Sequence, residues 1–358
     1  SADAILVTVG TPLSEEYDAD LSALEGVFLE LSSRVTSNQI VMIKSTVPPG
    51  VTRMLQHKFF PEKSNILMAF SPERLAEGNA ISQLKELPII VGGINEESTL
   101  ACSKFWEETL ACEVIPVSSP EAAELVKLAD NQWIDLNIAL ANELALLCDS
   151  LDFDVDILEI IKAANTLKKG SHYVNILTPS IGVGGYCLTK DPWFIHSLAQ
   201  KNSLNLKLPS AARKANDLMP LHASQKIIDF LKKNHQDHLN KKIAILGYSF
   251  KTNSGDTRFT PMKFFIDSLI DEGFKNIFIF DSTVKEDRYE SPIITWTENY
   301  SDCINNSDIL VFGAAHNDIK DISIKEISSK MNPNGMVYDG RIYLSYNEIR
   351  MLKSHGIN

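Results

Sequence analysis

Short apolar runs recur through the first third of the chain, and each of them ends in small or polar residues. One run leads into Gly10-Thr11-Pro12, and another, Ile40–Lys44, leads into Ser45-Thr46. Runs of this kind are typical of parallel strands that are buried on both faces. With helical segments between them they predict an open α/β sheet, in which ligands bind at the carboxyl ends of the strands.

The same pattern continues to about residue 118 and is followed by helices. We expect strands within 4–12 and at 40–44, 66–70, 88–93 and 113–117, with helices near 21–35 and 96–109. A long Ala- and Leu-rich helix is predicted over 120–151, followed by helices at 152–165, 191–200 and 210–231. Pro220 lies inside the last of these, so a kink or a break is expected there.

The α/β pattern restarts after a polar linker at 234–242. Strands are expected at the beginning of 243–251 and at 277–281, 308–313 and 336–341, with a helix over 261–272. This part predicts a second, Rossmann-like sheet that lacks a GxGxxG turn.

Composition excludes several classes of protein. The formal net charge of −12 disfavours a general nucleic-acid or anionic-membrane surface. The five cysteines are widely spaced and odd in number, which fits neither a disulfide framework nor a structural zinc site, and no other metal site is indicated. We find no signal peptide and no long apolar run, so we expect a cytoplasmic protein that does not bind membranes. A chain of 358 residues allows two or three domains.

A polar line runs along the long helix at helical spacing. Lys127 and Asn131 are four residues apart and should share a face with Glu124 and Asp135. A solvated stripe is the ordinary explanation of such a line. Because the flanking positions are apolar, however, we expect the helix to be covered, and a lysine there needs a partner or a function.

A glycine-rich loop precedes one cysteine. Gly182, Gly184 and Gly185 lead to Cys187, with Lys190 and Asp191 just behind it. A cysteine beside a lysine can become the thiolate nucleophile, and the aspartate can orient water or accept a proton. The alternative is that Cys187 is a buried, inert thiol.

Three cations occupy expected strand-end loops of the second sheet. Lys251, Arg258 and Arg341 suit a diphosphate, because the planar guanidinium forks onto phosphate oxygens. Each of them alone would more often be a solvated surface charge.

Together these residues resemble the nucleotide-sugar 6-dehydrogenase family, which includes the UDP-glucose, GDP-mannose and UDP-N-acetylhexosamine enzymes. The resemblance covers essentially the whole chain. The motifs, in order, are Val-Gly-Thr-Pro12, Lys-Ser-Thr-Val-Pro-Pro-Gly50, Ser-Pro-Glu-Arg74 with Glu77-Gly78, Ala-Glu-Leu-Val-Lys127 with Asn131, Gly-Val-Gly-Gly-Tyr-Cys187 with Lys190-Asp191, Lys251 with Asp256-Thr-Arg258, and Asp-Gly-Arg341.

The resemblance implies that a UDP-sugar's carbon-6 alcohol is oxidised to a carboxylate with two NAD+. Cys187 would attack the intermediate aldehyde to give a thiohemiacetal, and oxidation of this adduct would give a thioester that water cleaves. Lys127 would stabilise negative charge on oxygen, Asn131 would hold that oxygen or a water, and Glu73 and Asp191 would be acid–base groups. Thr46 would position water.

The resemblance also implies binding roles. The nicotinamide half of NAD is expected near Thr11, Thr46 and Glu77, and its diphosphate near Arg258. Lys251 would contact the sugar and Arg341 the nucleotide end of the substrate. The full set of expected substrate contacts is Glu73, Arg74, Lys127, Asn131, Gly184, Lys251 and Arg341.

The expected architecture follows from the same likeness. Residues 1–118 would be the remaining part of an NAD-binding domain with an incomplete Rossmann-like sheet, because no GxGxxG segment is present. Residues 119–233 would form a central, all-helical domain that dimerises and carries the cysteine loop. Residues 234–358 would bind the UDP-sugar on a second Rossmann-like sheet.

Details of the motifs favour the UDP-N-acetylhexosamine branch, although Tyr186 stands where that branch usually has His and Tyr173 where it usually has Arg. The alternative is a truncated, non-catalytic module that binds sugar nucleotides and dimerises. A hydroxyacid dehydrogenase of the 6-phosphogluconate type is a third possibility, disfavoured by the Cys187 loop.

Overall fold

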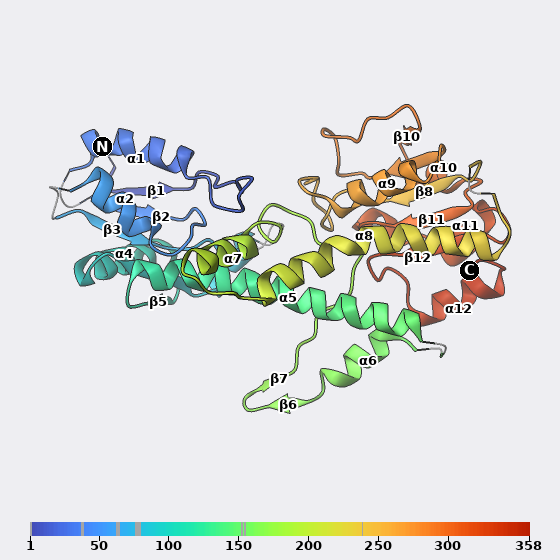
Figure 1. Cartoon of the computed structure of the whole chain (residues 1–358), viewed down its shortest axis with the longest axis horizontal. Helices are drawn as coiled ribbons and strands as arrows, with labels where there is room; N and C mark the ends of the chain where they lie inside the picture. Colours follow the sequence, from blue (N-terminus) through green and yellow to red (C-terminus); the bar gives the residue numbers. More distant parts are fainter. Residues whose placement is uncertain are drawn as a thin grey trace. The chain divides into compact units, whose positions relative to one another are not determined.

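The computed structural model describes residues 2–36, 39–61, 65–75, 80–151, 153, 155–237 and 239–358. They form two compact units, one of residues 1–134 with 190–210 and the other of 135–189 with 211–358. The chain passes from one unit to the other within α5 (Pro120–Ser150), between Thr189 and Lys190, and within α8 (Leu208–Lys233). Each unit contains one five-stranded sheet (Figure 1).

The sheet of the first unit runs in the order β1-β2-β3-β4-β5. Its strands are β1 (Ala4–Val7), β2 (Ile40–Ile43), β3 (Leu67–Phe70), β4 (Ile89–Gly93) and β5 (Val114–Pro116). The first three are parallel, and their last residues, Val7, Ile43 and Phe70, are in register. The segments that follow these strands therefore leave from the same edge, as the sequence predicted. β4 is antiparallel to β3.

Helices cover both faces of this sheet. Leu24 and Phe28 of α1 (Ser22–Arg34) and Leu55 of α2 (Val51–Phe59) pack in one core with β1, β2 and β3. Trp106 of α4 (Glu96–Leu110) and its neighbours form a second core with Met42. The unit also includes α3 (Ala80–Glu86) and α7 (Asp191–Lys201). The helices α2 and α3 were not predicted.

In the middle of the chain the predicted helices are present, with one correction. α5 matches the expected long helix, and α6 (Ile157–Ala164) is shorter than expected. Pro220 does not break α8, which runs through it to Lys233, so of the two expected outcomes the break is wrong and the kink stays a prediction. The Pro220 ring packs against Gly182, which has no side chain. A Cβ at position 182 would lie only 3.0 Å from Pro220 Cγ. A short hairpin, β6 (Lys168–Lys169) with β7 (His172–Tyr173), precedes the cysteine loop.

The sheet of the second unit is entirely parallel, in the order β10-β9-β8-β11-β12. Numbered along the chain this is the third, second, first, fourth and fifth strand, which is the Rossmann order. The strands are β8 (Ile243–Leu246), β9 (Ile277–Phe280), β10 (Ile294–Trp296), β11 (Ile309–Phe312) and β12 (Met336–Asp339). The Rossmann-like prediction is confirmed, and β10 was missed.

Alternate residues of these strands face two different cores. Ile243 and Ile245 pack with α8 and α9 (Pro261–Asp271), whereas Ala244 and Leu246 pack with the helices on the other face. Those helices are α10 (Tyr300–Ile304), α11 (Ile324–Lys330) and α12 (Tyr346–Ser354) (Figure 1). The 3-10 turn Asn317–Ile319 contributes Ile319 to the same core. A strand covered on both faces has only its ends open to a ligand, so the carboxyl edge is the candidate site.

Candidate active site

At the carboxyl edge of the first sheet, two predicted residues are hydrogen-bonded to each other. Thr11 follows β1 and is buried, and its hydroxyl donates to the carbonyl oxygen of Thr46 at 2.7 Å. Gly10, beside it, has no atom within 4 Å of the position that a Cβ would occupy. The backbone at this edge is therefore open to close approach by a ligand.

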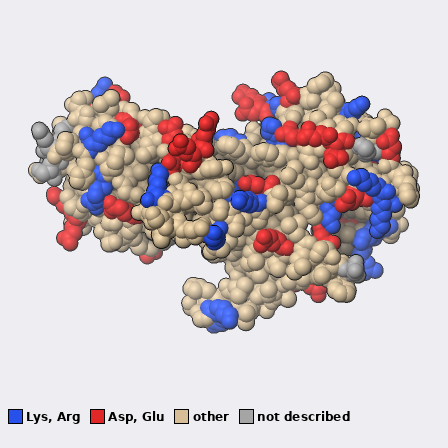
Figure 2. Space-filling view, in the orientation of Figure 1, with Lys and Arg blue, Asp and Glu red and all other residues tan. Residues whose placement is uncertain are grey.

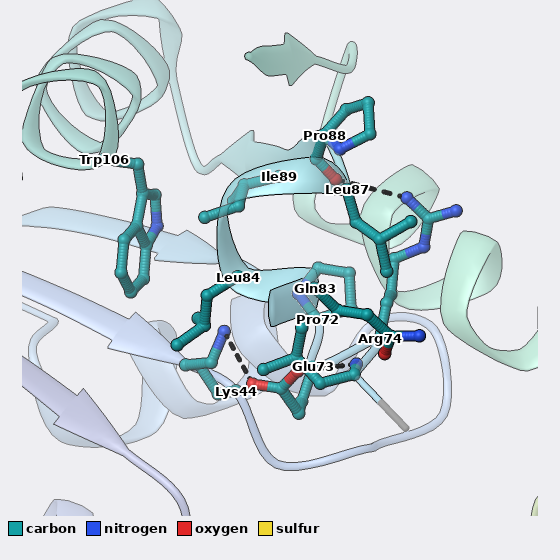
Figure 3. A pocket seen from close by; sticks show the side chains of 11 residues that line it. Lys44, Pro72, Glu73, Arg74, Gln83, Leu84, Leu87, Pro88, Ile89 and Trp106 are labelled. Carbon is teal, nitrogen blue, oxygen red and sulfur yellow. Dashed lines mark hydrogen bonds and ion pairs between the residues drawn. The ribbon is translucent and has the colours of Figure 1, made fainter. Parts of the chain in front are cut away.

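Glu73 lies at the same edge, after β3, and borders a small cavity of about 70 Å³ (Figure 3). Its Oε1 accepts a hydrogen bond from the backbone N–H of Leu75 at 2.8 Å, and its Oε2 is 3.4 Å from Lys44 Nζ. The same ammonium stands over the Trp106 ring, 5.0 Å from the centroid. Lys44 was not singled out from the sequence, and it places a positive charge beside the expected acid–base carboxylate.

The polar line of α5 is largely covered, as predicted. Glu124, Asn131 and Asp135 are buried, and Lys127 is half-buried. Glu124 accepts hydrogen bonds from the backbone N–H groups of Gly50, at 2.6 Å, and Thr52, at 2.8 Å, and so caps α2. Desolvation raises the pKa of Glu124 to about 7, although these hydrogen bonds oppose the rise.

Lys127 and Asn131 line a cavity of about 290 Å³ together with Arg74 and Trp133. Arg74 is held by Asp130, whose Oδ2 is 2.9 Å from the arginine Nε, and by the carbonyl oxygen of Pro88. No described residue forms an ion pair with Lys127. A cation in this position can stabilise an anionic oxygen of a ligand.

Asn131 also joins a buried polar cluster of the first unit. Its Nδ2 donates to Asp191 Oδ2 at 2.5 Å, and Lys190 Nζ lies 2.6 Å from Asp191 Oδ1. The Asp191 side chain is fully buried and begins α7. Lys190 also lies over the Phe194 ring, 4.4 Å from its centroid. A carboxylate held by a cation and an amide is fixed in orientation, as an acid–base group requires.

The cysteine loop belongs to the second unit. Cys187 is exposed, whereas Cys102, Cys112 and Cys303 are buried, so the alternative of a buried thiol does not hold for Cys187. A Cβ on Gly184 would come within 2.5 Å of Phe250 Cβ, which gives this glycine a packing reason beside its expected substrate contact. The N–H of Gly185 donates to the carbonyl oxygen of Arg258 at 3.0 Å, tying the loop to the segment after β8.

Two of the three predicted cations of the second unit have clear settings. The Arg258 guanidinium pairs with Asp256, with Nε 2.9 Å from Oδ1, and stands over the Tyr186 ring. Arg341 follows β12, and its Nε donates to the carbonyl oxygen of Gly313 at 2.9 Å. Its Nη2 is buried and has no hydrogen-bond partner. Burial lowers the pKa of Arg341 to about 10, because no described carboxylate pairs with it.

The two units divide the expected site residues. The first contains Thr11, Thr46, Glu73, Arg74, Lys127, Asn131 and Asp191, and the second contains Gly184, Cys187, Lys251, Arg258 and Arg341. Glu77 lies outside the described residues. Asp281 and His316, a buried pair in the second unit with an Nε2–Oδ2 distance of 3.0 Å, were missed because neither belongs to a local motif.

Two features of the described ranges bear on other classes of protein. No helix in them is long and apolar enough to cross a membrane. No group of three or more His, Cys, Asp and Glu residues in them is placed to hold a metal ion. Figure 2 shows Lys and Arg side chains interspersed with Asp and Glu on the face in view, which gives no single basic patch there.

Three family models match the chain in succession. Residues 1–110 match the NAD binding domain of the UDP-glucose/GDP-mannose dehydrogenase family, 121–218 its central domain and 244–345 its UDP binding domain. The UDP-N-acetyl-D-mannosamine dehydrogenase of Methanocaldococcus jannaschii is 34% identical over 351 residues, which cover 96% of this chain and 76% of that protein. The enzyme of that name from Campylobacter jejuni is 33% identical over 298 residues, 80% of this chain and 70% of that protein.

Solved structures agree with the sequence comparison. The UDP-D-ManNAc dehydrogenase of Pyrococcus horikoshii superposes with a TM-score of 0.84 at 28% identity, covering 96% of this chain and 78% of that one. An NDP-N-acetyl-D-galactosaminuronic acid dehydrogenase from Methanosarcina mazei gives a TM-score of 0.83 at 28% identity, covering 99% of this chain and 76% of that one.

Proposed function

Because the chain belongs to the UDP-glucose/GDP-mannose dehydrogenase family, we propose that it oxidises carbon 6 of UDP-N-acetyl-D-mannosamine, or a close UDP-N-acetylhexosamine, to the carboxylate. That it is a nucleotide-sugar dehydrogenase using NAD follows from the family itself. The choice of sugar rests on the names of its relatives. The observation that carries the chemistry is the buried Asp191 carboxylate at the start of α7. It is held by the neighbouring Lys190 and by Asn131, which lies on α5 with Lys127.

The first sheet fits the nicotinamide half of NAD. Its carboxyl edge presents the Thr11 and Thr46 segments, and Gly10 leaves the backbone accessible. The N-terminus of α2 is taken by Glu124, so this helix end is not available to a phosphate. In this proposal Thr11 and Thr46 hold the cofactor, with Glu77 and Arg258 as further contacts. When bound, NAD+ supplies the hydride acceptor for each of the two oxidations.

Cys187 is assigned the covalent role. After the alcohol has lost a hydride from carbon 6 and a proton from its oxygen, the Cys187 sulfur adds to the aldehyde carbon, and the carbonyl oxygen becomes a hydroxyl. Loss of a second hydride and of the hydroxyl proton leaves a thioester. Water then adds, the carbon–sulfur bond breaks, and the thiol is restored with release of the acid. An exposed thiol on a glycine-supported loop suits this role.

The first unit is assigned the proton transfers and charge stabilisation. Lys127 stabilises negative charge on the substrate's carbon-6 oxygen, and Asn131 holds that oxygen or a water. Asp191 and Glu73 are the acid–base candidates, and the Lys44 ammonium lies 3.4 Å from Glu73 Oε2. Thr46 positions the hydrolytic water, and Arg74 contacts the substrate.

The second unit is assigned the UDP-sugar. Arg341 is a partly buried cation with a buried Nη2, and no described carboxylate neutralises it, so an anionic diphosphate is its natural partner. Lys251 is assigned to the sugar and Gly184 to the backbone contact beside Cys187. The three-domain division at 118/119 and 233/234 remains part of this proposal.

The test of the function is the stoichiometry of cofactor reduction. We expect two NADH per UDP-N-acetyl-D-mannosamine consumed, measured at 340 nm against the sugar acid formed, because the alcohol and then the aldehyde are each oxidised. UDP-glucose is the comparison substrate and should be oxidised more slowly. One NADH per sugar would contradict the four-electron reaction. Calorimetric binding of the sugar nucleotide with no NADH would favour the alternative, a non-catalytic module that binds and dimerises.

We also propose that the chain forms a homodimer through its central helices. Several apolar side chains on α5 are about half exposed, among them Trp133, Leu140 and Leu147. Such a face is usually covered by a partner. Leu140→Asp should shift the sedimentation mass from a dimer to a monomer. Leu29→Asp on α1, which is also exposed but lies outside this face, should leave the mass unchanged. A dimer that persists in Leu140→Asp would contradict the interface.

A further inference from the structure

A buried aspartate–histidine pair holds the loop that carries Lys251. Asp281 follows β9 and His316 follows β11, the two strands that flank β8, and the loop itself follows β8. The His316 side chain is 2% exposed and its Nε2 lies 3.0 Å from Asp281 Oδ2. Because the carboxyl ends of these strands are in register, both side chains reach the same loop.

Asp281 fixes the first part of the loop. Its Oδ2 accepts hydrogen bonds from the backbone N–H groups of Tyr248, at 2.8 Å, and Ser249, at 2.9 Å, and its Oδ1 accepts the N–H of Thr283. Burial alone would raise the pKa of Asp281, but the hydrogen bonds from His316 and the backbone hold it well below its usual range. The residue is therefore a permanent carboxylate that anchors the loop.

His316 fixes the second part. Its Nδ1 accepts the backbone N–H of Asn253 at 2.9 Å, so its proton is on Nε2, where it is shared between Asp281 and the Ser249 hydroxyl at 3.2 Å. That hydroxyl in turn donates to the carbonyl oxygen of Lys251 at 3.2 Å. The backbone around Lys251 is thus held at Ser249 before it and at Asn253 after it, by one connected set of hydrogen bonds.

We propose that His316 is a positioning residue for Lys251. By holding the loop that carries Lys251, it directs the lysine ammonium toward the sugar of the bound UDP-sugar. The proposal rests on the assignment of Lys251 to the sugar under the proposed function. It predicts a selective effect: loss of the His316 hydrogen bond to Asn253 should weaken recognition of the sugar and leave recognition of UDP, which is assigned to Arg341, as it is.

Two substitutions separate the contacts made by the two ring nitrogens of His316. His316→Gln can still donate to Asp281, but it offers no acceptor to Asn253. His316→Asn keeps an acceptor near the Nδ1 position and loses the donor to Asp281. Isothermal titration calorimetry without NAD gives the dissociation constants of UDP-N-acetyl-D-mannosamine and of UDP. For His316→Gln we expect about tenfold weaker binding of the UDP-sugar and unchanged binding of UDP, and a smaller effect for His316→Asn.

A double-mutant cycle with Lys251→Met decides whether the effect passes through Lys251. The His316→Gln effect on UDP-sugar binding should disappear in the Lys251→Met background. Its persistence there, or an equal loss of UDP and UDP-sugar affinity in His316→Gln, would overturn the proposal. If Lys251→Met alone leaves UDP-sugar affinity unchanged, the assignment of Lys251 fails and this inference with it. The NADH stoichiometry is measured separately, so the covalent mechanism can fail while this inference stands.

Discussion

Cys187→Ser should abolish conversion of the UDP-sugar to its acid while leaving UDP-sugar binding within about twofold of the native affinity. Serine cannot form the thioester, and loss of an enzyme's nucleophile typically lowers turnover by on the order of 10³-fold or more. Binding should survive because Cys187 is exposed and no core depends on it. The measurements are NADH formation for turnover and calorimetry for binding.

Cys148→Ser is the matched control for this experiment. Cys148 lies on α5, is only partly buried and has no assigned role, so its replacement should leave turnover close to native. Normal acid formation by Cys187→Ser would rule out covalent catalysis by this residue. An aldehyde released after one NADH would instead locate the defect at the second oxidation, which is the result that the mechanism requires.

Arg341→Ala should weaken UDP binding by on the order of 10²-fold, because removing one partner of a buried charge contact costs about 2–5 kcal/mol. NAD binding should change by less than about twofold, since Arg341 is not among the contacts assigned to the cofactor and the nicotinamide half is assigned to the other sheet. Without ligand, the arginine is a partly buried cation whose pKa is lowered by desolvation to about 10, and it has no described carboxylate partner. Arg341→Met, which keeps most of the volume, should therefore fold at least as stably as the native chain in the absence of UDP.

The control for Arg341 is Arg350→Ala on α12, an exposed arginine in the same unit, which should alter neither stability nor UDP affinity. Calorimetry with UDP and with NAD gives the two affinities, and thermal unfolding gives the stability. An equal loss of UDP and NAD affinity in Arg341→Ala would mean that the division of ligands between the sheets is wrong.

The sequence predicted those parts of the fold whose signal is local. Apolar runs such as Ile243–Leu246 and Ile309–Phe312 are strands because both of their faces are buried, and that pattern is visible without a partner. The helix α12 could also have been found, since Ser345 and Glu348 form a capping box at its start. The strand β10 is only three residues long, so its pattern is too short to distinguish.

The elements that were missed depend on distant partners. α2 begins after Pro48-Pro49-Gly50, and its N-terminus is capped by Glu124, which is 74 residues from Gly50 in the sequence. The continuity of α8 through Pro220 depends on the space left by Gly182. A sequence pattern can suggest a cap or a break, but it does not show which side chain arrives from elsewhere in the chain.

The same distinction holds for the candidate site. Thr11, Thr46 and Glu73 could be grouped in advance because parallel strands end at a common edge, and the register of β1, β2 and β3 confirms this grouping. Asp281 and His316 could not be paired, because they are 35 residues apart and meet only when β9 and β11 take places on either side of β8. The roles assigned to the site residues remain predictions.

The carboxylate of Asp281 occupies the two backbone N–H groups after β8 that, in a dinucleotide-binding Rossmann sheet, would face the pyrophosphate. In the second sheet, the position of a bound phosphate is therefore taken by a carboxylate of the chain itself, that of Asp281. The conformational entropy of this loop is lost during folding, so substrate binding does not have to order the loop again. A sheet with the Rossmann strand order can therefore lose its pyrophosphate site and use the same loop, held rigid by Asp281, to bind a different ligand.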